Sequence, residues 1–231
     1  MKSLNVPPPN SIYVLDNKQG WIGLLDHMGS EVTITNAARV SFGKMKEVFD
    51  DKDEKLLKYL IENKHMTPFE HVQFQFSVHC PLYVRSQWHR HRAGWSYNEI
   101  SRRYTEVDME FYIPQNLRKQ STDNKQASMD EAIDNNDTMV DAYQACINEC
   151  YATYEKLIAN GVCREQARGI LPQTMFTTFW ATVDLRNLLH FIELRDDDHA
   201  QKEIREYAKA MKKLIRPYVP HVIEYFEKAK E

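Results

Sequence analysis

Alternating hydrophobic and polar residues mark the predicted strands of this chain. HVQFQFSVHC (71–80) alternates valine and phenylalanine with polar residues, a period of two that is typical of a half-buried strand. SIYVLD (11–16) is predicted as a short strand, and MFTTFWATV (175–183), rich in β-branched and aromatic residues, as a longer one. EFYIP (110–114), which ends at a proline, is a further strand candidate.

Hydrophobic residues at three- and four-residue spacing predict amphipathic helices elsewhere. The predicted helices cover 53–64, 184–195, the stretch from His199 to about Phe226, and a segment that begins at an S-x-x-E capping box of Ser128 and Glu131 and stops at Gly161. Helices therefore dominate over strands.

A less regular helix is predicted from Pro81, because proline is a favoured first helical residue. We expect this helix to end near Arg92, since a glycine follows shortly afterwards. Ser96 and Glu99 then fit a second S-x-x-E capping box, which predicts a short helix through Arg103.

The remaining segments lack clear periodicity. WIGLLDHMG (21–29) and ITNAARVSF (34–42) are predicted as short helical or mixed segments. Residues 1–10 are expected to be flexible, and the polar segment 115–127 is expected to be a mobile loop. Because there is no internal repeat and no interior linker rich in Gly, Pro or Ser, the pattern predicts a single α+β domain over 1–231, helix-rich with a small sheet.

Composition narrows the function classes. The chain has 231 residues, of which 42% are hydrophobic and 27% charged, as in an ordinary globular domain. A formal net charge of -3 and a pI near 6.3 argue against broad, non-specific binding of nucleic acid. There is no apolar run typical of a secretory signal, and no stretch approaches the ~20 apolar residues of a membrane-spanning helix. We therefore expect a cytoplasmic protein with neither a membrane nor a nucleic acid as partner.

The cysteines and histidines do not predict a metal site. The cysteines are Cys80, Cys146, Cys150 and Cys163. They form no C-x-x-C pair, so neither a zinc ribbon nor a disulfide framework is predicted, and the simplest interpretation is that they are buried small hydrophobic residues. His65 and His71 flank TPFE, but no third ligand follows at metal-site spacing, so no metal is predicted.

One segment departs from this ordinary composition. WHRHRAGWSYNEISRRY (88–104) gathers four arginines and two histidines among two tryptophans and two tyrosines, with a single acid, Glu99. Arginine is preferred over lysine where a planar, bidentate contact to phosphate or carboxylate is needed. The segment itself leaves two possibilities open: a site for an anionic small molecule, or a surface that binds phosphates with arginines and stacks bases on aromatic rings.

The stretch RHR…SYNEISRRY resembles the signature of the flavin-dependent thymidylate synthases, in which seven residues separate RHR from a serine. Further blocks are similar in order and spacing: AARVSF (37–42), HMTPFEH (65–71), QWHRHR (87–92), EFYIP (110–114), REQARGILP (164–172), DLRNLLHFIELR (184–195) and HAQKEI (199–204). This chain departs from the signature at one place, because eight residues, AGWSYNEI, separate Arg92 from Ser101. The extra position lies near Gly94 and Trp95.

The resemblance implies the flavin-dependent thymidylate synthase fold and an FAD-dependent methyltransferase. In the implied reaction dUMP becomes dTMP, 5,10-methylenetetrahydrofolate provides the carbon, and a tightly held FAD, reduced by NADPH, provides the hydride. It also implies a homotetramer with sites at subunit interfaces. The arginine-rich segment suits phosphate-bearing ligands independently, since it combines cations with aromatic walls. A flavin-binding regulator without catalysis is the remaining alternative.

Position by position, the resemblance assigns site residues. FAD contacts are assigned to Ser41, Thr67, Arg90, His91, Arg92, Glu99, Asp184, Arg186 and His190. Contacts to dUMP are assigned to Gln87, Arg90, Glu99, Ser101, Arg102, Arg103, Arg168 and Arg195. Arg195 matches the arginine that ionises or polarises uracil N3 and is the expected catalytic residue. His65 is placed at the edge of the flavin site, where it could relay protons or contact folate.

Helix geometry makes an additional prediction for the segment from Asp184. Arg186 and His190 are four residues apart and therefore lie on one face, whereas Arg195 is half a turn away from Arg186. One helix would then serve two different sites. We expect Arg103 and Arg195 to reach a given dUMP from different subunits.

Overall fold

The computed structural model describes residues 4–105, 109–125 and 127–229. Its centre is a five-stranded antiparallel sheet with strand order β1-β2-β3-β7-β4, and a separate two-stranded sheet pairs β5 with β6. The strands are β1 (Ile12–Val14), β2 (Gly20–Met28), β3 (Gln73–Pro81), β4 (Trp95–Glu99), β5 (Arg118–Gln120), β6 (Ser128–Ala132) and β7 (Phe176–Asp184).

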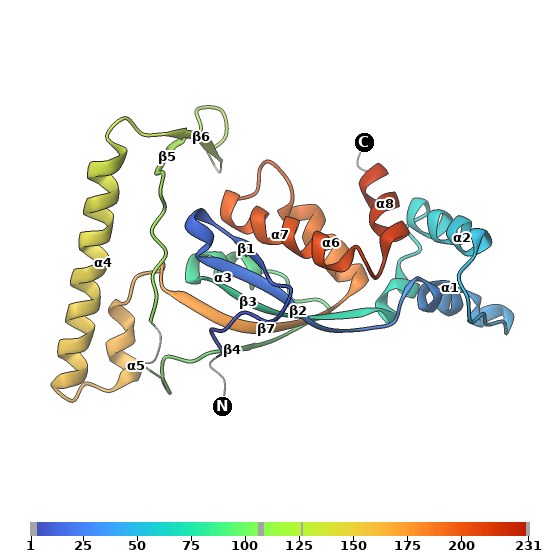
Figure 1. Cartoon of the computed structure of the whole chain (residues 1–231), viewed down its shortest axis with the longest axis horizontal. Coiled ribbons are helices and arrows are strands. Elements are labelled where there is room, and N and C mark those ends of the chain that lie inside the picture. The colour runs from blue at the N-terminus through green and yellow to red at the C-terminus, as the bar shows by residue number, and fades with distance from the viewer. Residues whose placement is uncertain (1–3, 106–108, 126, 230–231) are drawn as a thin grey trace.

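Helices cover one face of the large sheet and extend beyond both of its ends (Figure 1). They are α1 (Glu31–Arg39), α2 (Asp51–Glu62), α3 (Leu82–Trp88), α4 (Asn136–Ala159), α5 (Arg164–Ala167), α6 (Leu185–Arg195), α7 (Lys202–Ile215) and α8 (Pro220–Lys228). Short 3-10 turns are η1 (Asp16–Lys18), η2 (Val40–Phe42), η3 (Thr67–His71) and η4 (Arg168–Ile170). Helices α3, α6 and α7 lie over the sheet, α4 and α5 at one end, and α1, α2 and α8 at the other.

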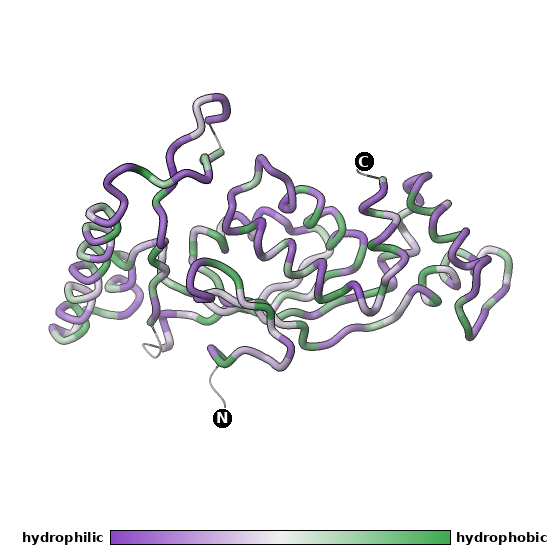
Figure 2. Tube along the Cα trace, turned by 45° about the horizontal axis from the view of Figure 1, so that its top comes forward, coloured by the Kyte–Doolittle hydropathy of each residue, from purple (hydrophilic) through white to green (hydrophobic). Residues whose placement is uncertain are grey.

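The core lies between the sheet and helices α3, α6 and α7. Phe76 pairs with Ala181 and Val78 with Phe179 across β3 and β7, and all four are fully buried. The hydrophobic stretches of the strands and of the helix faces above them lie together in the middle of the molecule (Figure 2). Burial of these apolar side chains is the main force that holds the layers together.

The opposite face of the sheet is partly covered as well, which the alternating pattern did not predict. His79 lies between the rings of Trp21 and Phe176, with centroid distances of 5.5 Å and 4.5 Å, and is buried. Asn5 accepts a hydrogen bond from the hydroxyl of Thr178 at 2.7 Å, so the N-terminal segment crosses this face. β3 is therefore buried on both sides over part of its length.

Strong periodicity predicted the right elements. The strands at 11–16, 71–80 and 175–183 and the helices at 53–64 and 184–195 are confirmed. The predicted helix from His199 is two helices, because Pro220 begins α8 after a break.

Secondary structure was predicted less accurately for the short apolar segments. In the segment 21–29, residues 21–28 belong to strand β2 instead of a helical segment, because pairing with β1 and β3 decides between states that an apolar run leaves open. EFYIP (110–114) contributes only an isolated bridge between Phe111 and Met175.

Both predicted capping boxes are wrong. Ser96 and Glu99 lie in strand β4, which pairs with β7, and Ser128 and Glu131 lie in strand β6. A capping box is a local preference, and strand pairing overrides it, with the distant β7 in one case and with the neighbouring β5 in the other.

Two further boundaries differ from the prediction. Helix α3 ends at Trp88, one turn before Arg92. The described part of 115–127 contains strand β5, where a loop was expected, and its mobility stays a prediction. Among the described helices, none is long and apolar enough to cross a membrane.

Candidate functional site

The arginine-rich segment leaves helix α3 and runs over helix α6. Trp88 at the end of α3 is fully buried and packs against Phe179, Phe191 and Tyr207, which anchors the start of the segment. The segment and α6 enclose the arginine hollow, a cavity of about 430 Å³. It is lined by Arg90, His91, Arg92, Ala93, Trp95, Asn187, His190, Leu194 and Arg195.

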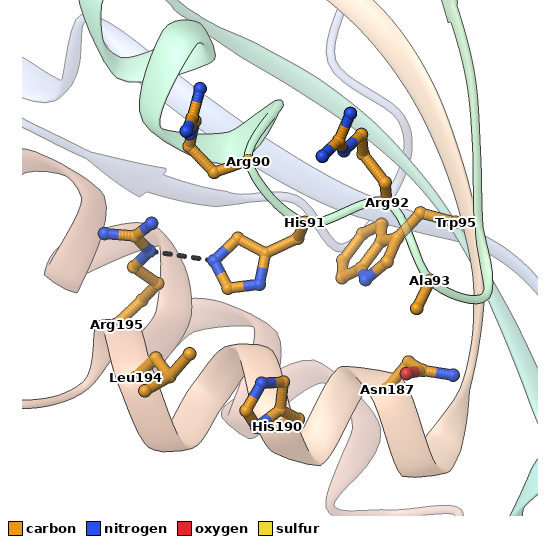
Figure 3. A pocket seen from close by; sticks show the side chains of 9 residues that line it. All are labelled: Arg90, His91, Arg92, Ala93, Trp95, Asn187, His190, Leu194 and Arg195. Carbon is orange, nitrogen blue, oxygen red and sulfur yellow. Dashed lines mark hydrogen bonds between the residues drawn. The ribbon is translucent and has the colours of Figure 1, made fainter.

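Arg195 is held in the arginine hollow by hydrogen bonds. Its Nε donates to His91 Nε2 at 2.9 Å, and its terminal nitrogens donate to the side-chain and backbone oxygens of Gln87 at 3.1 and 3.2 Å. Figure 3 shows the His91 ring pointing toward α6, while the side chains of Arg90 and Arg92 point away from that helix. The expected catalytic arginine is therefore fixed in direction before any ligand arrives.

His91 is neutral in this arrangement. Burial, followed by the nearby charges of Arg195 and His190, lowers the pKa of His91 to about 4. Because its Nε2 accepts a hydrogen bond, the ring proton is on Nδ1. At pH 7 the neutral ring accepts a hydrogen bond from the guanidinium of Arg195 and adds no second positive charge beside it.

Two more cavities follow helix α6 toward its N-terminus. The Asp184 hollow, of about 410 Å³, shares Trp95 with the arginine hollow and is lined by Glu70, Gln73, Gly94, Trp95, Ser96, Thr182, Val183 and Asp184. The Thr67 hollow, also about 410 Å³, is lined by Ala38, Leu60, Lys64, His65, Met66, Thr67, Pro68 and Arg186. Arg186 pairs with Glu70 at 2.5 Å, which links these two cavities.

The extra residue of the signature is accommodated by a tight turn at Gly94. Asp184 caps α6 by accepting hydrogen bonds from the backbone and side-chain nitrogens of Asn187, at 2.9 and 2.7 Å. Gly94 has φ +70° and packs directly on this cap, where a Cβ atom would lie 2.1 Å from Asp184 Oδ2. The turn places the Trp95 indole between two cavities, stacked on Tyr97 with centroids 5.6 Å apart.

We expect Gly94→Ala to lower the free energy of unfolding by about 2–3 kcal/mol, because a left-handed backbone costs about 1–2 kcal/mol and a displaced cap about 1 kcal/mol. Urea denaturation measures the change. Gly161→Ala is the matched control, since Gly161 has φ +81° but nothing within 4 Å of a Cβ atom. Equal losses in the two variants would show that the contact between Gly94 and the cap is unimportant.

A fourth cavity, the Arg168 hollow, lies at the other end of strand β4. It measures about 680 Å³ and is lined by Leu82, Glu99, Ile100, Ser101, Arg102, Glu165, Arg168, Gly169, Leu171, Gln173, Met175 and Thr177. Glu99 at the end of β4 is four residues from Trp95 at its start. The two ends of this strand are roughly 13 Å apart at the rise of an extended chain.

The structure divides the predicted flavin contacts among these cavities. The arginine hollow is lined by Arg90, His91, Arg92 and His190. Asp184 lines the Asp184 hollow, and Glu99 lines the Arg168 hollow. The Thr67 hollow is lined by Thr67 and Arg186, and also by His65. Ser41, exposed in η2, lines none of these hollows, but its hydroxyl donates to the carbonyl oxygen of Ala38, which lines the Thr67 hollow, at 3.5 Å. Most of the set thus follows one row of hollows along α6.

The predicted dUMP contacts form two groups. Glu99, Ser101, Arg102 and Arg168 line the Arg168 hollow, whereas Arg90 and Arg195, with Gln87 bonded to Arg195, belong to the arginine hollow. Arg103 lines neither hollow and pairs with Glu165 at 3.2 Å. Strand β4 separates the two groups within one chain.

The predicted division of helix α6 into two functional faces is wrong. His190 and Arg195 line the same hollow, while Arg186 turns to Glu70 and lines a different one. Arg195 is the last residue of the helix, so its long side chain can bend back to His91. Angular position on a helical wheel does not determine where such a side chain ends.

Sequence reasoning missed several residues that shape the cavities: Glu70, Arg85, Trp95, Asn187 and Thr177. Two of them carried a signal in the sequence: Trp95 is one of the aromatic residues of the arginine-rich segment, and Arg85 is a charged residue inside the apolar segment PLYVRSQW. Within the described residues, no group of three His, Cys, Asp or Glu side chains is arranged to bind a metal ion.

Comparison with known proteins identifies close relatives. A flavin-dependent thymidylate synthase of Thermosipho melanesiensis is 42% identical over 216 residues, covering 93% of this chain and 93% of that protein. A flavin-dependent thymidylate synthase of Wolbachia pipientis is 46% identical over 213 residues, covering 90% of this chain and 72% of that protein.

A solved structure and a family model agree with these relatives. The crystal structure of the UMP/dUMP methylase PolB from Streptomyces cacaoi, bound with 5-Br dUMP, superposes with a TM-score of 0.81 at 30% identity and covers 90% of this chain and 94% of that one. Residues 23–221 match the model of the family described as thymidylate synthase complementing protein. The chain therefore belongs to this family, the flavin-dependent thymidylate synthases.

Proposed function

We propose that this protein methylates dUMP to dTMP, with 5,10-methylenetetrahydrofolate as carbon donor and FAD, reduced by NADPH, as hydride carrier. The names of its relatives support a flavin and thymidylate synthesis, and the solved relative supports a uracil nucleotide as substrate. The observation that carries the proposal is the row of three adjoining hollows along α6, which collects most of the predicted flavin contacts.

The residues along α6 fit a flavin dinucleotide. Arg90 and Arg92 are exposed, and the described part of the chain offers neither of them a salt bridge, so both cations can face a diphosphate. Trp95, Ala93 and Leu194 provide apolar walls for a planar ring. A bound flavin would supply the hydride that the reductive methylation needs.

Arg195 suits the nucleotide half of the reaction. Methylation requires uracil C5 to act as a carbon nucleophile, and negative charge at N3 and its neighbouring carbonyls raises electron density toward C5. A guanidinium that is already fixed by His91 and Gln87 stabilises this developing charge without losing its own proton.

The division of the dUMP contacts supports a site shared between subunits. One nucleotide that touched both groups within a single chain would have to pass strand β4 and bridge two separate hollows. A second copy can instead bring its arginine hollow to the Arg168 hollow of the first. We therefore propose a homotetramer whose sites combine hollows from different chains.

The test is direct. The purified protein should show flavin absorbance near ~450 nm, a property of the cofactor, and should form dTMP from dUMP when given methylenetetrahydrofolate and NADPH. Bound flavin without dTMP would favour a regulator that lacks catalysis. Absence of flavin together with binding of single-stranded nucleic acid would favour the alternative role of the arginine-rich segment.

A variant that lacks all cysteines should keep dTMP formation. The other type of thymidylate synthase attacks uracil C6 with a thiolate, which needs a cysteine of low pKa in a cationic setting. Cys80 is buried, which raises the pKa of its thiol, and none of the four cysteines lines the arginine or Arg168 hollow. Cys146 and Cys163 are exposed, contrary to the expectation that the cysteines are buried.

The measurement is dTMP formation, without added dithiol, by a variant in which all four cysteines are replaced by serine. Its flavin content and thermal unfolding are the controls for the fold. If one cysteine proves necessary for chemistry while the flavin and the fold are intact, the proposed mechanism fails.

A further inference from the structure

The Arg168 hollow contains a carboxylate whose position is set from inside the protein. Glu99 lines this hollow with a side chain that is 30% exposed. Its Oε1 accepts a hydrogen bond from the Thr177 hydroxyl at 2.7 Å, and its Oε2 accepts one from Arg85 Nε at 3.0 Å. Both oxygens are anchored, and each keeps a lone pair that can accept from a ligand.

Arg85 itself is held rigidly. It lies on helix α3, and its side chain is 7% exposed. Its guanidinium carbon is 4.4 Å from the ring centre of Phe179 and 4.6 Å from that of Tyr97, within the range of cation–π contacts. The two rings and the carboxylate together restrict the orientation of the guanidinium.

Stability is a weak explanation for this buried pair. An apolar pair of similar volume often stabilises a core as well as a buried ion pair does. Arg85 Nη1 is moreover buried without a hydrogen-bond partner in the described structure, which costs free energy. The location of the pair, at the wall of a cavity lined by other predicted nucleotide contacts, suggests a different role.

We propose that Arg85 is a positioning residue, which fixes Glu99 to accept a hydrogen bond from the sugar hydroxyl of the nucleotide in the Arg168 hollow. The inference rests on the proposed function, because it takes dUMP as the ligand. Ser101, Arg102 and Arg168 are the groups that suit the phosphate. A carboxylate among them repels phosphate, so its oxygens suit a hydrogen-bond donor of the nucleotide. dUMP offers two such donors, uracil N3–H and the 3′-hydroxyl of the sugar. The proposed function places N3 beside Arg195, which lines the arginine hollow, so the 3′-hydroxyl is the donor left for Glu99.

The experiment compares dUMP with 2′,3′-dideoxyuridine monophosphate, which lacks that hydroxyl. Both are titrated by calorimetry into the assembled, flavin-loaded wild type and the Arg85→Met variant. We expect wild type to prefer dUMP by about tenfold or more, as for a hydrogen bond to a charged group. In Arg85→Met the preference should fall to about one, while the affinity for the dideoxy nucleotide stays within about twofold. A purely structural role would weaken both nucleotides alike.

Two further variants keep the test decisive. Arg85→Lys retains the charge, should keep part of the preference, and takes the place of Arg85→Met if that variant does not fold. Arg118→Met is the matched control, because it removes another largely buried pair, Arg118–Glu203 at 2.9 Å, outside the cavities and should leave the preference unchanged.

The possible failures are distinguishable. A wild type that binds neither nucleotide contradicts the proposed function itself. A wild type that binds both nucleotides equally well, or Arg85 variants that keep the full wild-type preference, would overturn the positioning role of Arg85 and leave the proposed function standing.

Discussion

Replacing Arg195 with alanine is expected to slow dTMP formation by about 10²–10³, the usual loss when one fixed donor to developing charge is removed. The flavin should stay bound, because most of its predicted contacts lie on other residues along α6. Single-turnover formation of dTMP, with flavin content measured on the same sample, gives the result.

The surroundings of Arg195 add a second readout. Its charge helps to keep the pKa of His91 low, so in Arg195→Ala the pKa of His91 should rise from about 4 toward its ordinary value, which NMR titration of the ring can follow. Arg216→Ala, which removes an exposed arginine paired with Glu227, is the control and should not slow the reaction. If Arg195→Ala forms dTMP at an undiminished rate, Arg195 has no catalytic role and is only a cation at the end of a helix.

Two inactive variants, Arg168→Ala and Arg195→Ala, should regain activity when they are unfolded together and reassembled. The sequence suggested Arg103 for this test, but Arg103 pairs with Glu165 and Arg168 lines the hollow. If a site takes these arginines from different chains, about a quarter of the sites in an equal mixture are intact, since each position is correct in half of the chains.

The control pairs Arg195→Ala with Arg90→Ala. Both residues line the arginine hollow of the same chain, so no mixed site can be intact and activity should stay low. Mass measurement of the assemblies confirms that chains have mixed. If mixed assemblies of the Arg168 and Arg195 variants remain as inactive as either parent, the shared site is wrong.

Local periodicity was sufficient for the elements that build the framework. β3 follows from alternation and α6 from a helical stripe, because their buried faces must repeat with the period of the element. β7 follows from its β-branched and aromatic residues. The arginine-rich segment and the blocks around it were enough to predict the family and its candidate residues. The chemistry requires those residues independently of how the surrounding elements are packed.

Tertiary structure decided how those residues are grouped. Strand pairing made Ser96–Glu99 part of an edge strand, and so placed Glu99 and Trp95 at separate cavities. The contact of Arg85 with Glu99 joins a helix to a strand and has no local pattern. The bend of Arg195 to His91 likewise depends on packing between α3 and α6. Periodicity reports only which way a residue faces within its own element, whereas a site forms between elements whose contacts are set by the packing of the whole core.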